Sequence, residues 1–284
     1  MAAHSVGIVC DSTADLEPEY LASRDIAMVP LTVFFGDETF LDWVQIRPDE
    51  FYERLKNARK LPRTSQPSPA RFTQAYEALA EQGCTSIVSV HLTSKLSGTV
   101  ESANIAARTA PVPVHVVDTL NVSQGCGLVV KAAADARDTG ADGEAVGALA
   151  TATAAATRLF FVLDTLDYLV KGGRAGKATA LAASVLDIKP VLHITGGVVE
   201  PFKRTRGFNK ALAELAAHVA ADARARGRLK VSLLNACDAE RVAALADALT
   251  DAGADVQIES TGLIGAVIGT YAGPGAVGVA YHPL

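Results

Sequence analysis

The sequence lacks the features that mark several protein classes. Its 284 residues include only 4 cysteines, none in a Cys-x-x-Cys pair, which argues against a disulfide framework and predicts buried, reduced thiols. No apolar run approaches the roughly 18 residues of a membrane-spanning helix. The net charge of −5 argues against a nucleic-acid partner, because such binding depends on clustered Lys and Arg. We expect a cytoplasmic protein without a signal peptide or an integral membrane segment.

Motifs of common catalytic sites are also missing. The 6 histidines contain no His-Glu-x-x-His pattern and no i,i+4 pair, so no metal site is expected. No Gly-x-Ser-x-Gly elbow is present, and a Ser-His-Asp triad is unsupported. The Gly-x-x-x-x-Gly-Lys phosphate loop is absent as well. The sequence therefore predicts no catalytic residue and no cofactor.

Apolar residues make up 49% of the chain, enough for a large buried core. In the first half, short apolar runs alternate with helical patterns. This alternation predicts an α/β unit with a parallel sheet and helices on both faces. The predicted strands span residues 6–10, 26–35, 86–92 and 114–117.

The second half carries a different signal. Gly196-Gly197 supplies positive φ at both turn positions, which predicts a hairpin over 194–199 and hence a mixed or antiparallel sheet. Helices are expected at 164–170, 178–184, 210–225 and 239–252. We therefore predict an α/β fold with two domains, 1–157 and 158–284.

The loop Thr93-Ser94-Lys95-Leu96-Ser97-Gly98-Thr99 is the strongest candidate for a binding site. It follows an apolar strand and precedes a predicted helix, so hydroxyls and the free N–H groups of the first helical turn converge there. Such a loop can bind a phosphate or a carboxylate. The alternative is an ordinary helix N-cap at Ser97. A second hydroxyl cluster, Thr64-Ser65-Gln66-Pro67-Ser68, is either part of the same site or a capped turn.

Two basic clusters and a glycine-rich segment follow. Lys171-Gly172-Gly173-Arg174 and Lys203-Arg204-Thr205-Arg206-Gly207 are each either a solvated helix end or a positive patch for an anionic ligand or partner. The glycine-rich segment 264–278 is either a structural loop or a ligand-lining segment with the hydroxyls of Thr270 and Tyr271.

These segments, in this order, resemble the DegV family of fatty-acid-binding proteins, which includes the FakB-type subunits of bacterial fatty acid kinase. The matching stretches begin with Val9-Cys10-Asp11-Ser12-Thr13-Ala14-Asp15-Leu16 and continue through 64–68, 93–99, 166–174, 188–192, 203–207 and 269–275. They extend from near residue 6 to near residue 280. The resemblance implies two α/β domains with a long-chain fatty acid buried between and within them.

The resemblance also implies that the ligand lies at the junction of the two domains, with its acyl carboxylate in a hydroxyl-rich site there. By motif, the carboxylate residues are Thr64, Ser65, Ser94, Ser97, Gly98, Thr270 and Tyr271. The family usually has histidine where this chain has Tyr271. A tyrosine can donate a hydrogen bond, but it stays neutral at pH 7, unlike a protonated imidazole.

The arginines of the basic clusters are implied to serve a kinase partner and the phosphorylation step rather than the acyl chain. They are Arg174 and Arg206, with Arg204 as the alternative to Arg206. The implied function is a non-catalytic protein that binds a long-chain fatty acid and presents its carboxylate to the catalytic subunit of a fatty acid kinase for acyl-phosphate formation. Two alternatives stay open. One is a lipid carrier or sensor without a kinase role, and the other is a small phosphotransferase or hydrolase using the same anion site.

Overall fold

The computed structural model describes residues 4–181 and 189–284. The first half is built on a four-stranded sheet in the order β2-β1-β6-β7, and every neighbouring pair is parallel. Its central strands are almost entirely buried, as their apolar sequences predict. The strands are β1 (Val6–Asp11), β2 (Ile26–Val29), β6 (Ser86–His91) and β7 (Val114–Asp118).

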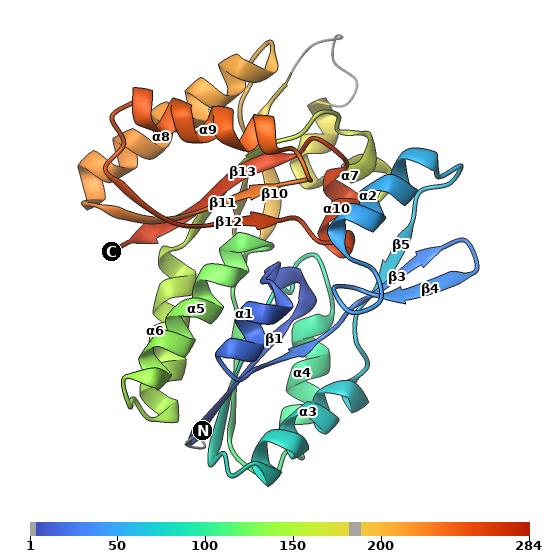
Figure 1. Cartoon of the computed structure of the whole chain (residues 1–284), viewed down its shortest axis with the longest axis vertical. Helices are drawn as coiled ribbons and strands as arrows, with labels where there is room; N and C mark the ends of the chain where they lie inside the picture. The colour runs from blue at the N-terminus through green and yellow to red at the C-terminus, as the bar shows by residue number, and fades with distance from the viewer. Residues whose placement is uncertain (1–3, 182–188) are drawn as a thin grey trace.

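Helices cover both faces of this sheet, which confirms the predicted alternation (Figure 1). One face packs against α3 (Pro69–Glu81) and α4 (Thr99–Ala107), and the other against α5 (Gln124–Asp138) and α6 (Gly143–Ala156). The short η1 (Ser12–Ala14) follows β1, and α1 (Pro18–Ser23) lies beside β2. Because the strands are parallel, the loops at their carboxyl ends share one edge, which faces the C-terminal half.

A small antiparallel sheet, in the order β4-β3-β5, extends from the first half. It contains β3 (Thr32–Phe35), β4 (Glu38–Leu41) and β5 (Arg63–Ser65), with α2 (Pro48–Asn57) between the last two. The prediction of a single strand over 26–35 is therefore wrong. The chain leaves the parallel sheet at Pro30, which has no N–H for a strand ladder, and β3 joins a different sheet.

The second half contains a six-stranded mixed sheet in the order β10-β9-β8-β13-β11-β12, in which only β11 and β12 pair in parallel. The predicted hairpin joins β9 to β10, with φ of 56° at Gly196 and 83° at Gly197. The strands are β8 (Arg158–Val162), β9 (Val191–Thr195), β10 (Val198–Lys203), β11 (Leu229–Asn235), β12 (Val256–Leu263) and β13 (Val277–Pro283).

Two long helices, α8 (Phe208–Arg226) and α9 (Ala239–Asp251), cover one face of this sheet. The shorter α7 (Asp167–Lys171), η2 (Gly176–Leu181) and α10 (Ala266–Ala272) lie in its connections. The helix expected at 178–184 is a 3-10 helix as far as it is described. Residues 182–184 and Ile188 of the stretch 188–192 lie outside the described residues.

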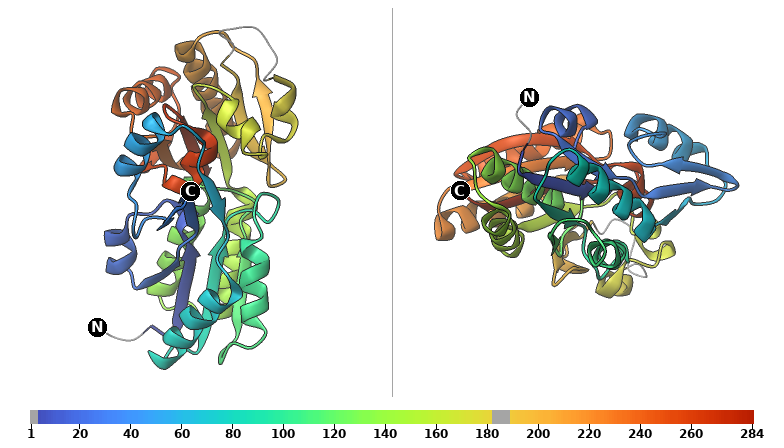
Figure 2. Two further views of the ribbon diagram at one scale, coloured as in Figure 1. Left: turned by 90° about the vertical axis from the view of Figure 1, so that its right-hand side faces the viewer. Right: turned by 90° about the horizontal axis from the view of Figure 1, so that it is seen from below.

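The two halves stack along the long axis of the molecule (Figure 2). Helix α5 packs against β11 and β13, and α10 contacts β3, β5 and α2. The division of the chain at 157/158 stays a prediction, and β8, the first strand of the second sheet, begins at Arg158. Within residues 4–181 and 189–284, no helix has the length and apolar character needed to cross a membrane.

Candidate functional site

A cavity of about 630 Å³ lies where the two halves meet. Its volume falls in the range of small-molecule binding sites, roughly 300–1,000 Å³. The walls are largely apolar and come from both halves, so an apolar ligand of substantial size could be buried there. Apolar lining residues include Leu31, Leu92 and Leu96 from the first half and Leu159, Leu234 and Ile264 from the second.

Several polar residues of the cavity wall contact one another. The Thr64 hydroxyl, on β5, lies 2.6 Å from the Tyr271 hydroxyl, on α10. Arg174 follows α7 in the chain, and its guanidinium lies over the Tyr271 ring, 4.9 Å from the ring centroid. Arg174 also donates to the carbonyls of Gly172 (2.9 Å) and Leu96 (3.5 Å). These contacts join three separate elements into one polar wall.

Ser97 and Gly98 add the loop before α4 to this wall. Helix α4 begins at Thr99, and the Ser97 hydroxyl lies 2.9 Å from the Thr99 hydroxyl. A Cβ on Gly98 would lie 2.3 Å from Oε1 of Gln66, so only glycine leaves room for that side chain. The Gln66 amide donates to Ser102 (3.3 Å) and therefore ties the segment after β5 to α4. Gln66 belongs to the predicted hydroxyl cluster 64–68, but no role was predicted for its side chain.

The structure brings together most of the residues expected at the carboxylate: Thr64, Ser65, Ser97, Gly98 and Tyr271 all line the cavity. Ser94 does not; it is exposed, and its N–H donates to the Asp118 carboxylate (3.2 Å). Thr270 lies on a neighbouring pocket, and its hydroxyl donates to the Ala266 carbonyl (2.9 Å). Helix α10 occupies the middle of the glycine-rich segment and places Tyr271 on the cavity.

The arginines expected to serve a kinase are separated in space. Arg174 lines the cavity. Arg204 and Arg206 are exposed on the segment between β10 and α8, and neither lines this cavity. Only Arg174 of the three can therefore influence a ligand in the cavity directly.

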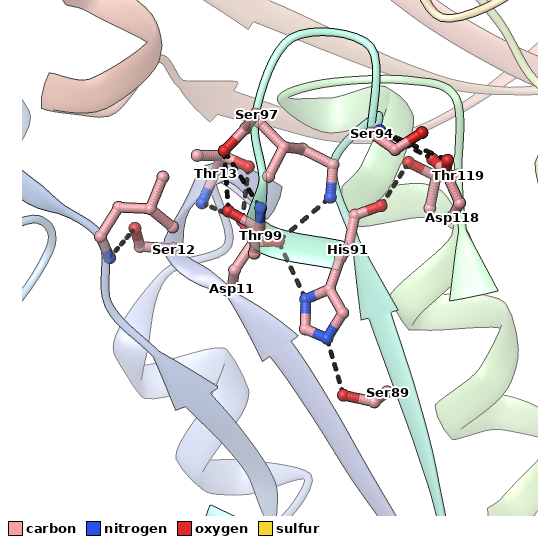
Figure 3. Close-up of polar contacts among 12 residues, drawn as sticks. Asp11, Ser12, Thr13, Ser89, His91, Ser94, Ser97, Thr99, Asp118 and Thr119 are labelled. Carbon is pink, nitrogen blue, oxygen red and sulfur yellow. Dashed lines mark hydrogen bonds and ion pairs between the residues drawn. The ribbon is translucent and has the colours of Figure 1, made fainter. Parts of the chain in front are cut away.

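The loop that carries Ser97 is anchored by a buried carboxylate beneath it (Figure 3). Asp11, the last residue of β1, accepts hydrogen bonds from the backbone N–H of Leu92 (3.0 Å) and of Thr13 (2.9 Å). It also accepts from Nδ1 of His91 at 3.0 Å. One carboxylate thus fixes the ends of two neighbouring parallel strands and the start of both loops that follow them.

The contacts of His91 continue into the core of the first half (Figure 3). Its Nε2 lies 2.7 Å from the Ser89 hydroxyl, which lies 2.9 Å from the Tyr76 hydroxyl. Ser89, His91 and Asp11 therefore form the Ser-His-Asp geometry that no sequence motif indicated. All three have 0% exposure, so no substrate reaches the serine and this series of hydrogen bonds is structural. The available signal was the i,i+2 spacing of Ser89 and His91, which places both on one face of β6.

Two further buried carboxylates connect the first half with α10. Asp15 accepts from the Trp43 indole N–H (3.2 Å) and the Gly265 N–H (2.9 Å), and Asp42 accepts from the Ala266 N–H (3.0 Å). Burial raises the pKa of Asp42 to about 7. Burial, and then the neighbouring Asp42 carboxylate, raises the pKa of Asp15 well above its ordinary value. No role was predicted for either residue, yet both bind the first turn of the helix that carries Tyr271.

The cysteines offer no metal or redox centre. Cys10, Cys84 and Cys126 are buried free thiols, as predicted, and burial raises the pKa of Cys84. Cys237 is exposed, so the prediction of burial is wrong at that position. In the part of the chain that the structure describes, no three His, Cys, Asp or Glu side chains gather as metal ligands would.

Comparison with known proteins places this geometry in a family. A family model described as "Uncharacterised protein, DegV family" matches residues 5–284. The chain belongs to the DegV family. A DegV domain-containing protein of Streptomyces coelicolor is 39% identical to it over 274 residues, which cover 96% of this chain and 97% of the relative. The resemblance read from the motifs is thereby confirmed at the level of the family.

Solved structures share the fold of this DegV protein. A fatty-acid-binding DegV family protein from Thermus thermophilus superposes with a TM-score of 0.92 at 35% identity, covering 98% of this chain and 99% of the other. A stearic-acid-binding protein from Eubacterium ventriosum gives a TM-score of 0.89 at 28% identity, covering 98% of each chain. The parallel four-stranded sheet joined to a mixed six-stranded sheet is therefore a DegV architecture.

Proposed function

We propose that this DegV protein binds a long-chain fatty acid, with its acyl tail in the apolar cavity and its carboxylate at the wall formed by Thr64, Ser97 and Tyr271. The cavity itself carries the proposal, because it combines a large apolar volume with a cluster of hydroxyls on one connected wall. Burying each CH₂ contributes about 0.8 kcal/mol, which for a long chain sums to the order of 10 kcal/mol before the costs of binding. The Thermus and Eubacterium relatives, described as binding fatty acids, support the same ligand class.

The carboxylate needs donors, because an unpaired buried charge would cost several kcal/mol. The Thr64 and Tyr271 hydroxyls lie 2.6 Å apart and share one hydrogen bond, in which one of them donates and the other accepts. A carboxylate that approaches them accepts from both hydroxyls and replaces that bond, while Ser97 supplies a third donor. The positive charge of Arg174, stacked on the Tyr271 ring, further favours an anion at this wall.

We further propose that the protein presents the bound carboxylate to the catalytic subunit of a fatty acid kinase, which supplies ATP and metal. Arg174 would support phosphorylation at the cavity wall. Arg206, or Arg204 in its place, would contact the kinase, since both are exposed on one surface segment. The fatty acid is then a ligand handed to another enzyme, and this chain needs no nucleophile of its own.

Native mass spectrometry of the purified protein tests the first proposal. We expect a co-purified mass that matches a fatty acid, and lower occupancy in the Thr64→Ala/Ser97→Ala double variant. Thr39→Ala/Ser68→Ala is the matched control, because both of its hydroxyls are exposed and neither lines the cavity. Unchanged occupancy in the first double variant would reject this carboxylate site. An empty protein that alone turns over a phosphate or ester substrate would favour the enzyme alternative.

A reconstituted assay with a fatty acid kinase catalytic subunit tests presentation. Arg174→Gln is expected to retain lipid but to lower acyl-phosphate formation about tenfold, as for the loss of a charge-assisted contact. Arg206→Gln and Arg204→Gln should raise the kinase concentration that is needed for half-maximal acyl-phosphate formation. Arg224→Gln, an exposed arginine on α8, serves as the control. If the fatty acid bound to the wild-type protein is not phosphorylated in the presence of the kinase subunit, the result would favour the carrier or sensor alternative.

A further inference from the structure

A second pocket, of about 340 Å³, lies on the other side of the polar wall. We call it the outer pocket; it lies among Arg63, Thr64, Lys171, Arg174, Thr270 and Tyr271. Thr64, Arg174 and Tyr271 also line the main cavity, so these three side chains separate the two spaces. Helix α10, which carries Tyr271, contacts both β5, which carries Thr64, and α7, which ends shortly before Arg174 (Figure 1).

The outer pocket is positively charged in a chain whose net charge is −5. Its lining includes Arg63, Lys171 and Arg174, and none of the described Asp or Glu residues. Within the described residues, neither arginine has a carboxylate within 4.0 Å. Lys171 has one, Asp167 at 3.7 Å, but both side chains are about two-thirds exposed, so water screens that pair. The cationic charge is therefore available to an anion.

The wall between the two spaces includes one hydrogen bond that a ligand head group could replace. Tyr271 contacts Thr64 through a single hydrogen bond, and its ring lies against Gly172, where a Cβ would come within 2.4 Å of the ring. Arg174 covers the ring on the polar wall. Exchanging the Thr64–Tyr271 bond for bonds to a ligand head group would connect the main cavity with the outer pocket.

We propose that the outer pocket binds the phosphoryl group of a long-chain acyl phosphate whose tail occupies the main cavity, an inference that rests on the proposed fatty-acid function. At the wall, a carboxylate would accept from the hydroxyls and would be favoured by the charge of Arg174. A phosphoryl group extends the head group past the wall and adds oxygens with a charge of up to about −2. Arginine and lysine are the side chains suited to that group, through paired or single charge-assisted hydrogen bonds. Arg63 and Lys171 are the cations that only the phosphorylated head group would reach.

Calorimetric titration of the delipidated protein with three probes tests this. The probes are palmitate, hexadecyl phosphate (a hydrolytically stable lipid phosphate) and inorganic phosphate. Arg63→Gln and Lys171→Gln should each weaken hexadecyl phosphate about tenfold, the size of one lost charge-assisted contact, and leave palmitate within about twofold. Lys210→Gln, an exposed cation on α8 that lines neither space, should change neither affinity.

The outcomes separate this inference from the proposed function. Hexadecyl phosphate affinity that is unchanged in both variants, or palmitate affinity that falls equally, overturns the outer pocket as the phosphoryl site. Inorganic phosphate that binds as tightly as hexadecyl phosphate, with the same residue dependence, shows a free-phosphate site instead and also overturns it. If wild-type protein fails to bind palmitate but binds hexadecyl phosphate through Arg63 and Lys171, the fatty-acid proposal fails while the outer pocket stands.

Discussion

Two tyrosine–hydroxyl pairs in this protein have nearly the same chemistry and opposite surroundings. Tyr76 bonds Ser89 at 2.9 Å inside the first half, and Tyr271 bonds Thr64 at 2.6 Å at the junction of the halves. The first pair continues into His91 and then Asp11, all without exposure to solvent. The second borders an apolar cavity on one side and a basic pocket on the other. The surroundings of a hydroxyl pair therefore decide whether a ligand can reach it.

The difference has an energetic consequence. We call the buried pair of Tyr76 and Ser89 the closed pair. Every polar group there already has a partner, so removal of one member leaves the others unsatisfied in a low-dielectric core. We call the pair of Tyr271 and Thr64 the open pair. There each hydroxyl can exchange its partner for a ligand oxygen at little cost in free energy. Mutations in the closed network should therefore lower stability, and mutations in the open wall should lower ligand affinity.

The largest effect is expected for Asp11→Ala. The change removes the acceptor shared by His91 and the backbone N–H groups of Thr13 and Leu92, and should lower the free energy of unfolding by about 3–5 kcal/mol. Urea unfolding followed by circular dichroism measures it. Asp167→Ala, at an exposed carboxylate, should cost less than about 1 kcal/mol. Equal stability of the two variants would mean that the buried network around Asp11 adds no more to the free energy of unfolding than an exposed carboxylate does.

The second effect concerns pH. Burial raises the pKa of Asp42 from 3.8 to about 7, so the folded state binds a proton more tightly than the unfolded chain does. The resulting stability is fully present below about pH 4 and is lost as pH rises through about 7, by up to about 1.4 kcal/mol per pH unit. Asp42→Asn should flatten this slope in urea midpoints measured at pH 5, 6, 7 and 8. Asp15 faces Asp42 and its pKa is also raised, so a residual slope is expected.

The third prediction compares one serine variant from each of the two regions. Ser89→Ala should lower the free energy of unfolding by about 1–3 kcal/mol, because it leaves His91 and Tyr76 without their shared partner, and should not alter lipid occupancy. Ser97→Ala should lower fatty-acid affinity about tenfold with little change in stability. Thermal unfolding and palmitate titration of both variants provide the readouts. A loss of affinity in Ser89→Ala without a loss of stability would break the distinction.

The smallest effect is expected for Tyr271→Phe, which removes one hydroxyl from the open wall. Fatty-acid affinity should fall about threefold to tenfold, with unfolding changed by less than about 1 kcal/mol. Tyr168→Phe is the control, because that tyrosine lies on the adjacent α7 and does not line the main cavity. If both variants behave alike, Tyr271 contributes ring packing rather than a hydrogen bond.

Much of the framework follows from local sequence. The apolar run 86–92 and the hydroxyls after it predicted β6, its loop and α4, because buried strands and helix starts have short-range signatures. Gly196-Gly197 predicted the β9–β10 hairpin, since positive φ at both positions is a property of those residues alone. Thr64 and Ser97 were expected to share one site, and both line the cavity.

Other features depended on contacts between distant residues. Asp11 and His91 are 80 positions apart, and neither residue type nor spacing reveals that they meet. The strand predicted at 26–35 divides at Pro30 because β3 pairs with β4 and β5 rather than with β1. The fit of Gln66 against Gly98 likewise appears only when the segment after β5 lies beside α4.

The sequence by itself determined the succession of strands, hydroxyl-rich loops and helices, because backbone preference and apolar periodicity act over a few residues. It also determined which residue types were present to bind an anion. Only the tertiary structure decided that Ser89 is sealed within the core while Ser97 and Thr64 line a cavity, and that Arg63 and Lys171 share a pocket beyond them. The reason is physical: burial, partner and charge environment are properties of the packed chain, set by elements that meet from far apart in the sequence.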